Sequence, residues 1–255
     1  MPQGVFNPIG HTSVVDSIVN QVELLILEGI LKDGARLPSE RQLAEQLDVS
    51  RPKVREALKL LEDRDLIVVR HGEGTFVAPL IGSAMSPALI ALYGRHKDAF
   101  LDYLEFRAEQ EGFAAGLAAT RATDADKEIL KTVMAELDAA HESQDQAASR
   151  DADIKFHSAI IDASHNSLLV HSMASIYALT QQNLFYNRSF LSALDSSGEK
   201  LLAQHREIYL SIENGDPERA TKAARDHLDF VRTSYLEDQS RAHRNGLSNR
   251  RLALI

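Results

Sequence analysis

Three histidines and one aspartate in the second half of the sequence have the types and spacing of a metal centre. Asp153 and His157 are four residues apart, so on a helix they project from one face. His205 and His227 lie on two later segments with helical patterns, and three antiparallel helices could bring all four side chains together inside a bundle. Such donors suit zinc, and also nickel, manganese or iron. Spacing alone favours the alternative, a solvated Asp/His pair and unrelated histidines, because the chain has 10 histidines.

A second group of chemistry-bearing residues is cationic and lies near residue 50. Ser50, Arg51, Lys53 and Arg55 stand at the start of one predicted helix, and Arg41 stands near the start of the helix before it. Arginine can pair with guanine through two hydrogen bonds, and hydroxyl and ammonium groups suit phosphate. This chemistry is that of a helix that reads DNA. Solvated helix faces of a scaffold or protein-binding module are the alternative, because a basic run is weak evidence by itself.

The elements around these cations predict a helix-turn-helix followed by a wing. Apolar residues at helical spacing predict a helix over 14–31, which Gly29 and Gly34 end. Ser39 with Gln42 has the spacing of a capping box for a second helix. Ser50 and Pro52 predict the start of the third helix. The runs "DLIVVR" and "GTFVA" predict a strand pair joined at His71 and Gly72, whose turn can enter a minor groove. Together these elements favour DNA binding.

From residue 97 onward every segment has a helical pattern, which predicts an antiparallel six-helix bundle. Start signals occur at Thr123 with Asp126, at Ser196 with Glu199, and at Asp216 before Pro217. The predicted helices are 97–121, 123–141, 144–163, 167–190, 198–213 and 217–239. The predicted organisation is a winged helix-turn-helix DNA-binding domain at 10–79, a linker at 80–95, a helical effector-binding domain at 96–240 and a frayed basic tail at 241–255. The expected fold class is therefore mainly α.

Composition narrows the function classes. The chain has 255 residues, no cysteine and a formal net charge of −9. The absence of cysteine excludes disulfides and cysteine-ligated zinc. The negative net charge argues against a protein that coats nucleic acid or membranes by bulk charge. We find no signal-peptide pattern and no apolar run long enough to span a membrane, and we expect a cytoplasmic protein.

The N-terminal motifs resemble those of the GntR family of bacterial transcription regulators. "LPSERQLA", "VSRPKVREAL" and "GEGTFV" stand at its three most recognisable places. The resemblance implies that Arg41, Arg51 and Arg55 contact operator bases or phosphates, and that Ser50 contacts a phosphate. It implies a minor-groove contact for His71 and Gly72. Lys53 varies in such families, and its expected phosphate contact rests on its charge.

The helical half resembles the FCD ligand-binding domain of the FadR-like GntR subfamily. The similar stretches are "YLEFRAEQEGFAAGLAATRAT", "DADIKFHSAIIDASHNSLL" and "QHREIYLSIENGDPERATKAARDHL". The subfamily's metal-binding members imply a cation, zinc first, on Asp153, His157, His205 and His227. The complete set argues against a fatty-acyl ligand.

An effector pocket beside the cation is expected to hold a small carboxylate. Arg107 matches the arginine that points into the subfamily's pocket, and a guanidinium can bind a carboxylate through two hydrogen bonds. An ion pair between Arg107 and Glu111 on one helix is the alternative. Asn183, Tyr186 and Arg188 are weaker candidates for pocket polar groups.

The expected function is a homodimeric regulator, taken as a repressor, that binds a palindromic double-stranded operator. Pyruvate, lactate, glycolate or a sugar acid would control its operator affinity. One alternative is a regulator that responds to metal alone. A metal-dependent hydrolase is less favoured, because no H-E-x-x-H motif, nucleophile elbow or glycine-rich phosphate loop is present. We therefore expect no enzyme activity.

Overall fold

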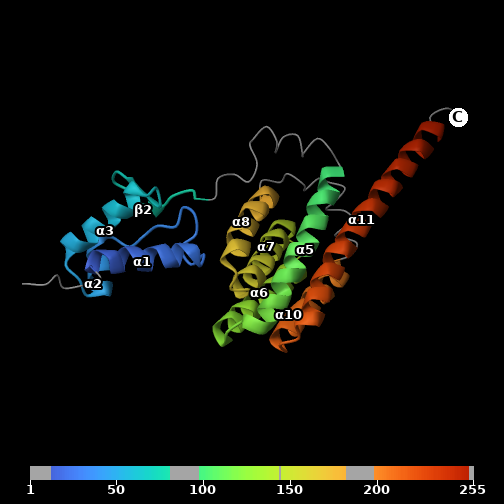
Figure 1. The fold of residues 1–255 in the computed structure, drawn as a ribbon. Coiled ribbons are helices and arrows are strands. Elements are labelled where there is room, and N and C mark those ends of the chain that lie inside the picture. Colours follow the sequence, from blue (N-terminus) through green and yellow to red (C-terminus); the bar gives the residue numbers. More distant parts are fainter. Residues whose placement is uncertain (1–12, 81–97, 144, 182–197, 253–255) are drawn as a thin grey trace, which may run out of the picture. The chain divides into compact units, whose positions relative to one another are not determined.

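The computed structural model describes residues 13–80, 98–143, 145–181 and 198–252, and these are mainly α-helical, as the sequence predicts (Figure 1). The chain divides into two compact units, Met1–Gly82 and Ser83–Ile255. Apart from Leu80, the segment predicted as a linker lies outside the described residues. Among the helices described, none has both the length and the apolar character that a bilayer crossing needs.

The first unit is a helix-turn-helix with its own apolar core. Its helices are α1 (Val14–Leu27), α2 (Glu40–Leu47) and α3 (Arg51–Asp63). The predicted capping box closes the start of α2, where Ser39 and Gln42 bond each other's backbone amides. Helix α1 ends at Leu27, four residues before the end of its predicted range. The backbone turns into the left-handed region at Gly29, one of the two predicted end signals, with a φ of +72°. The three helices bury their apolar stripes against one another.

A two-stranded antiparallel wing follows α3. Strands β1 (Ile67–Arg70) and β2 (Gly74–Val77) pair with Ile67 opposite Val77 and Arg70 opposite Gly74. His71 and Gly72 lie in the turn between them, and Gly72 has a φ of +78° that favours glycine. The sequence did not predict the partner of the outer edge of β2, where Arg36 forms an isolated bridge with Phe76.

The second unit is a bundle of helices. The described helices are α5 (Asp98–Arg121), α6 (Asp124–Ser143), α7 (Gln146–Ala163), α8 (Ser167–Gln181), α10 (Gly198–Glu213) and α11 (Pro217–Leu252). Helix α5 packs against α7, α10 and α11. Its contact with α11 is close, since a Cβ atom on Gly116 would lie 2.4 Å from Oγ1 of Thr221. Of the predicted start signals, Thr123 with Asp126 and Asp216 before Pro217 cap their helices, and Ser196 lies outside the described residues.

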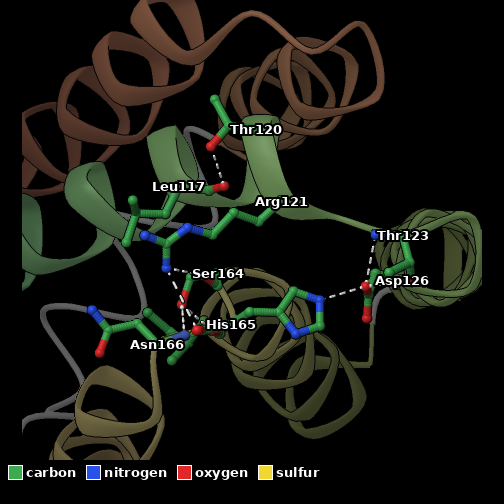
Figure 2. A network of polar contacts seen from close by, with 9 residues as sticks. Leu117, Thr120, Arg121, Thr123, Asp126, Ser164, His165 and Asn166 are labelled. Atoms are coloured by element: carbon green, nitrogen blue, oxygen red, sulfur yellow. Dashed lines mark hydrogen bonds and ion pairs between the residues drawn. The ribbon is translucent and has the colours of Figure 1, made fainter.

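One polar network ties three helix ends together at the Arg121 end of α5. Figure 2 shows the Arg121 guanidinium reaching the turn between α7 and α8, where Nη1 donates to the carbonyl of Ser164 over 3.2 Å. In the same turn Nε2 of His165 lies 2.9 Å from Oδ2 of Asp126, which also accepts from the backbone amide of Thr123. The start of α6 is thereby joined to the α7–α8 turn, which helps to hold α7 in place.

Helix α11 differs from the sequence expectation. The prediction ended this helix near residue 239 and expected a frayed tail at 241–255, but the helix continues to Leu252. Arginine is a good helix former, and Arg250 and Arg251 in the last turn interact favourably with the carbonyl end of the helix dipole. The continuation is exposed along its whole described length.

Candidate metal centre and DNA-reading helix

The structure brings the four predicted metal-ligating residues together inside the bundle. Helix α7 carries Asp153 and His157, α10 carries His205 and α11 carries His227. One donor atom from each lies within 4.8 Å of the others. The Nε2 atoms of His157 and His205 are 3.3 Å apart. Oδ1 of Asp153 lies 3.2 Å from Nε2 of His205. The imidazoles are buried and the carboxylate is partly exposed. Three nitrogens and one oxygen at these separations fit a borderline divalent cation.

Two oxygen acceptors orient the histidine rings of this cluster. Oε2 of the buried Glu111, on α5, lies 2.7 Å from Nδ1 of His157. Oε1 of Gln204, on α10, lies 3.2 Å from Nδ1 of His227. With Nδ1 engaged, each ring leaves Nε2 for the cluster, which is the usual arrangement around protein-bound metals. Sequence reasoning missed Gln204 and considered Glu111 only as a partner of Arg107.

The protonation tendencies of these groups follow from burial and the two carboxylates. Burial opposes the charged form of His157, but Glu111 and Asp153 outweigh it and raise its pKa to about 9. Burial lowers the pKa of His205, and burial with the rings of His205 and His157 holds the pKa of His227 well below its usual value. His205 and His227 are therefore neutral at neutral pH, as metal ligands must be, whereas His157 has to lose a proton first.

Arg107 lies buried beside the cluster and also forms the ion pair that was its alternative interpretation. Its Nε donates to Oε1 of Glu111 over 2.5 Å. Its guanidinium carbon lies 5.6 Å from the ring centroid of Tyr103 and 5.3 Å from that of Tyr177. The chain Arg107–Glu111–His157 thus connects a buried cation to a cluster ligand. Asn183, Tyr186 and Arg188 lie outside the described residues.

The second candidate site is the N-terminal end of α3. Ser50 occupies the N-cap position, but its side chain makes no capping hydrogen bond. Arg55 donates to Glu40 from Nε over 3.0 Å and from Nη2 over 2.8 Å, and Nη2 of Arg51 lies 3.8 Å from the same carboxylate. The hydrogen bond from Arg55 lowers the pKa of Glu40. Sequence reasoning missed Glu40, which joins α2 to α3.

The remaining cations at this end are exposed as well. Arg41 pairs with Glu45 and Lys53 pairs with Glu56, each over 3.0 Å. Exposed ion pairs contribute only about 0–1 kcal/mol, so phosphates and base edges can compete with these carboxylates. The structure therefore leaves the predicted DNA-contacting side chains accessible at a helix end and in the wing turn.

Both units match described protein families. Residues 15–77 match "Bacterial regulatory proteins, gntR family", and residues 102–230 match "FCD domain".

Curated relatives match most of the chain. It is 34% identical over 233 residues to the "Putative L-lactate dehydrogenase operon regulatory protein" of Escherichia coli strain K12, covering 89% of each chain. It is 32% identical to the "Glc operon transcriptional activator" of the same organism, covering 90% of this chain and 92% of the relative. Identity to the "HTH-type transcriptional regulator LutR" of Bacillus subtilis strain 168 is 33%, covering 84% and 99%.

Among solved structures, "Streptococcus agalactiae GntR" matches with a TM-score of 0.52 and 30% identity. The match covers 87% of this chain and 100% of that one.

Proposed function

Because the chain belongs to the gntR family of bacterial regulatory proteins and carries an FCD domain, it is a DNA-binding transcriptional regulator, and we propose that a small organic acid controls its operator affinity. The acid would bind in the helical unit together with a divalent cation. The observation that carries this proposal is the cluster formed by the partly exposed Asp153 and the buried His157, His205 and His227. The relatives are regulators rather than enzymes, which sets the hydrolase alternative aside.

The cation site would be built as follows. His205 and His227 supply neutral imidazoles, Asp153 supplies a carboxylate, and His157 joins them after losing its proton to solvent. Zinc is our first candidate because it accepts nitrogen and carboxylate ligands, with nickel, manganese and iron as further candidates. A bound cation would act as a Lewis acid that can hold an organic carboxylate.

The buried guanidinium of Arg107 supports an acid as effector. It is positively charged at all relevant pH values. It contacts Glu111, which in turn contacts His157 of the cluster. A small hydroxy or keto acid could meet the cation and Arg107 together. One relative is named as a regulator of an L-lactate dehydrogenase operon, so L-lactate is the first acid to test, followed by pyruvate, glycolate and sugar acids.

We place the DNA contacts on the first unit. Arg41, Arg51 and Arg55 would read bases or phosphates, and Ser50 and Lys53 would bind phosphates. His71 and Gly72 at the wing turn would approach the minor groove. A homodimer would present two such units to a palindromic double-stranded operator, because twofold sites mirror twofold proteins.

We further propose repression, since operator occupancy alone can exclude other proteins from the same DNA. A reporter gene behind the operator tests this direction. Deletion of the regulator should raise expression if it represses and lower expression if it activates.

The effector proposal is tested by operator affinity in four states of the full chain. These are metal-free protein, protein with zinc, protein with L-lactate, and protein with both, using fluorescence anisotropy on a duplex selected for binding. Linkage requires that an effector change the affinity by its differential binding, typically about 5–150-fold. We expect this change only when metal and acid are present together. A response to zinc alone supports the metal sensor instead, and no response to any acid overturns the proposal.

A matched pair of histidine variants completes the test. His205→Ala should lose the metal and the acid response while keeping operator binding. His171→Ala is the control, because it is the same substitution at a histidine that lies on α8, outside the cluster. If elemental analysis finds the same metal content in His205→Ala and in the control, the ligand set is wrong.

A further inference from the structure

The last three turns of α11 carry positive charge and no acidic residue. We define the C-terminal arm as residues 241–252, the helical part of α11 that is exposed on all sides. Figure 1 shows this end of α11 running on past the other helices of the bundle. At a rise of about 1.5 Å per residue the arm is about 18 Å long. It makes no contribution to the apolar clusters of the bundle among the described residues.

Four arginines give the arm its charge. It contains Arg241, Arg244, Arg250 and Arg251 and no aspartate or glutamate, in a chain whose net charge is −9. At about 100° per residue, Arg241, Arg244 and Arg251 fall within an arc of about 80° on one side of the helix. A cationic stripe of this kind has no role in packing the bundle.

The pairing state of these arginines is unusual for this protein. Elsewhere in the described chain, exposed cations commonly hold a carboxylate, as Lys155 holds Glu136 and Arg206 holds Asp138. Within the described residues, by contrast, no ion pair joins any of the four arm arginines to a carboxylate. The two in the last turn have a local role at the helix dipole, but that effect falls off within one turn and does not reach Arg241 and Arg244.

We propose that the C-terminal arm is a second DNA-contacting surface, which binds duplex phosphates. Charge complementarity favours DNA as the partner of the arm, since the chain is a DNA-binding regulator and a duplex is a dense array of phosphates. The arm carries no side chain suited to an apolar groove beyond Leu247 and Leu252. Its contacts are independent of sequence, because phosphates are the same on every duplex, and they add to the affinity of the full chain for DNA.

The test uses the full chain with all four arm arginines changed to glutamine, which preserves helix propensity and exposure. Affinity is measured against salt concentration on an operator duplex with long flanks and on a scrambled duplex of equal length. Each lost phosphate contact should reduce the slope of log K against log salt by about 0.9. The affinity loss should be the same factor on both duplexes, so that the preference for the operator is unchanged.

The matched control is Lys131→Gln, Lys155→Gln, Arg206→Gln and Lys222→Gln in one chain. It changes the net charge by the same amount at exposed, carboxylate-paired positions of the bundle. The control should keep the wild-type slope. An unchanged slope in the arm variant, or an equal change in the control, overturns the proposal.

Two measurements separate this result from other causes. Circular dichroism should show the same helix content in the arm variant and the wild type. Light scattering should show the same oligomeric state, and a loss of self-association would assign the arginines to a protein contact and overturn the proposal.

Because the inference rests on DNA binding through α3, Arg51→Ala is tested in parallel. It should lose operator preference while keeping the salt slope that the arm contributes on the scrambled duplex.

Discussion

Glu111 on α5 places Oε2 at 2.7 Å from Nδ1 of His157 on α7, and its other carboxylate oxygen accepts from Arg107. The carboxylate is almost fully buried, and burial alone would raise its pKa, but Arg107 and His157 hold that pKa well below its ordinary value. One ionised side chain therefore sets the orientation of a cluster histidine and balances the guanidinium of the candidate effector site.

Glu111→Gln should weaken metal binding by about 10–100-fold, the usual effect of removing an acceptor behind a ligating histidine. The carboxamide keeps the shape but not the charge that orients His157. The measurement is competition for zinc with a chromophoric chelator. Glu109→Gln is the control, because Glu109 lies on the same helix and pairs with Arg225 at the surface.

The same substitution leaves Arg107 without its ionised partner, which is costly for a buried cation. Thermal unfolding of the metal-free variant must therefore be measured alongside. Equal zinc affinities of Glu111→Gln and Glu109→Gln, in protein that remains folded, would show that Glu111 has only a structural role.

Arg51→Ala and Arg55→Ala should each reduce operator preference without unfolding the first unit. Both side chains are exposed at the start of α3, and each lost base contact should cost about 1–3 kcal/mol of discrimination. Lys59→Ala is the control, since Lys59 is exposed nearer the C-terminal end of the same helix. The readout is the ratio of affinities for operator and scrambled duplexes. A ratio unchanged from wild type would remove α3 from base reading.

Glu40→Gln should raise affinity for scrambled DNA and lower operator preference. Glu40 holds Arg55 through two hydrogen bonds and lies near Arg51, so its charge opposes phosphate while its geometry orients the guanidinium of Arg55. The control is Glu62→Gln, an exposed glutamate on α3. Salt titrations on both duplexes give the two affinities. If Glu40→Gln raises both by the same factor, Glu40 acts through its charge alone.

Gly116→Ala should destabilise the bundle even though alanine is the better helix former. The new Cβ atom would lie 2.4 Å from Oγ1 of Thr221 and 3.4 Å from the carbonyl oxygen of Pro217. Overpacking costs about 1–3 kcal/mol, which exceeds the gain of about 1 kcal/mol in helix propensity. Urea denaturation measures the difference.

Gly246→Ala is the opposite case, because a Cβ atom at Gly246 meets nothing within 4 Å. It should leave the bundle intact and strengthen the helix of the arm.

Thr221→Ala in the Gly116→Ala background should restore the stability that Gly116→Ala removes. Failure of this rescue would mean that the contact with Thr221 is not the cause.

Asp126→Asn should lower stability at neutral pH by about 1 kcal/mol, as the loss of a capping interaction does. Burial raises the pKa of Asp126, but hydrogen bonds from the Thr123 hydroxyl and amide and from His165 outweigh it and lower this pKa from 3.8. The folded state thus favours the carboxylate. Its contribution is present above the unfolded pKa and is lost as the pH falls through the lower, folded value.

The unfolding free energies of Asp126→Asn and wild type should therefore begin to converge below about pH 4, near the unfolded pKa, and should meet only below the lowered pKa of the folded state. Chemical denaturation at a series of pH values measures this. Asp124→Asn, in the same helical turn, is the control. A difference that stays constant with pH would mean that the ionised form of Asp126 is not what stabilises this end of the bundle.

Local signals were sufficient for much of the fold. Ser39 with Gln42 and Thr123 with Asp126 close their helix ends as predicted, because a capping box involves atoms only three residues apart. The range of α1 was predicted four residues too long, although Gly29 was identified as an end signal, and the continuation of α11 was missed. At these positions a short polar or glycine-containing segment can take more than one conformation, and local propensity is a weak guide.

The sequence by itself determined that a basic helix end follows a turn, that a wing comes after it, and that three histidines and an aspartate lie on helical segments. Their types, caps and apolar stripes depend on neighbours within about one helical turn. Only the tertiary structure decided that Asp153, His157, His205 and His227 share one point, and that Glu111 and Gln204 stand behind two of the rings. The physical reason is that such meetings depend on how helices cross and rotate against one another, which side-chain packing sets across the whole bundle.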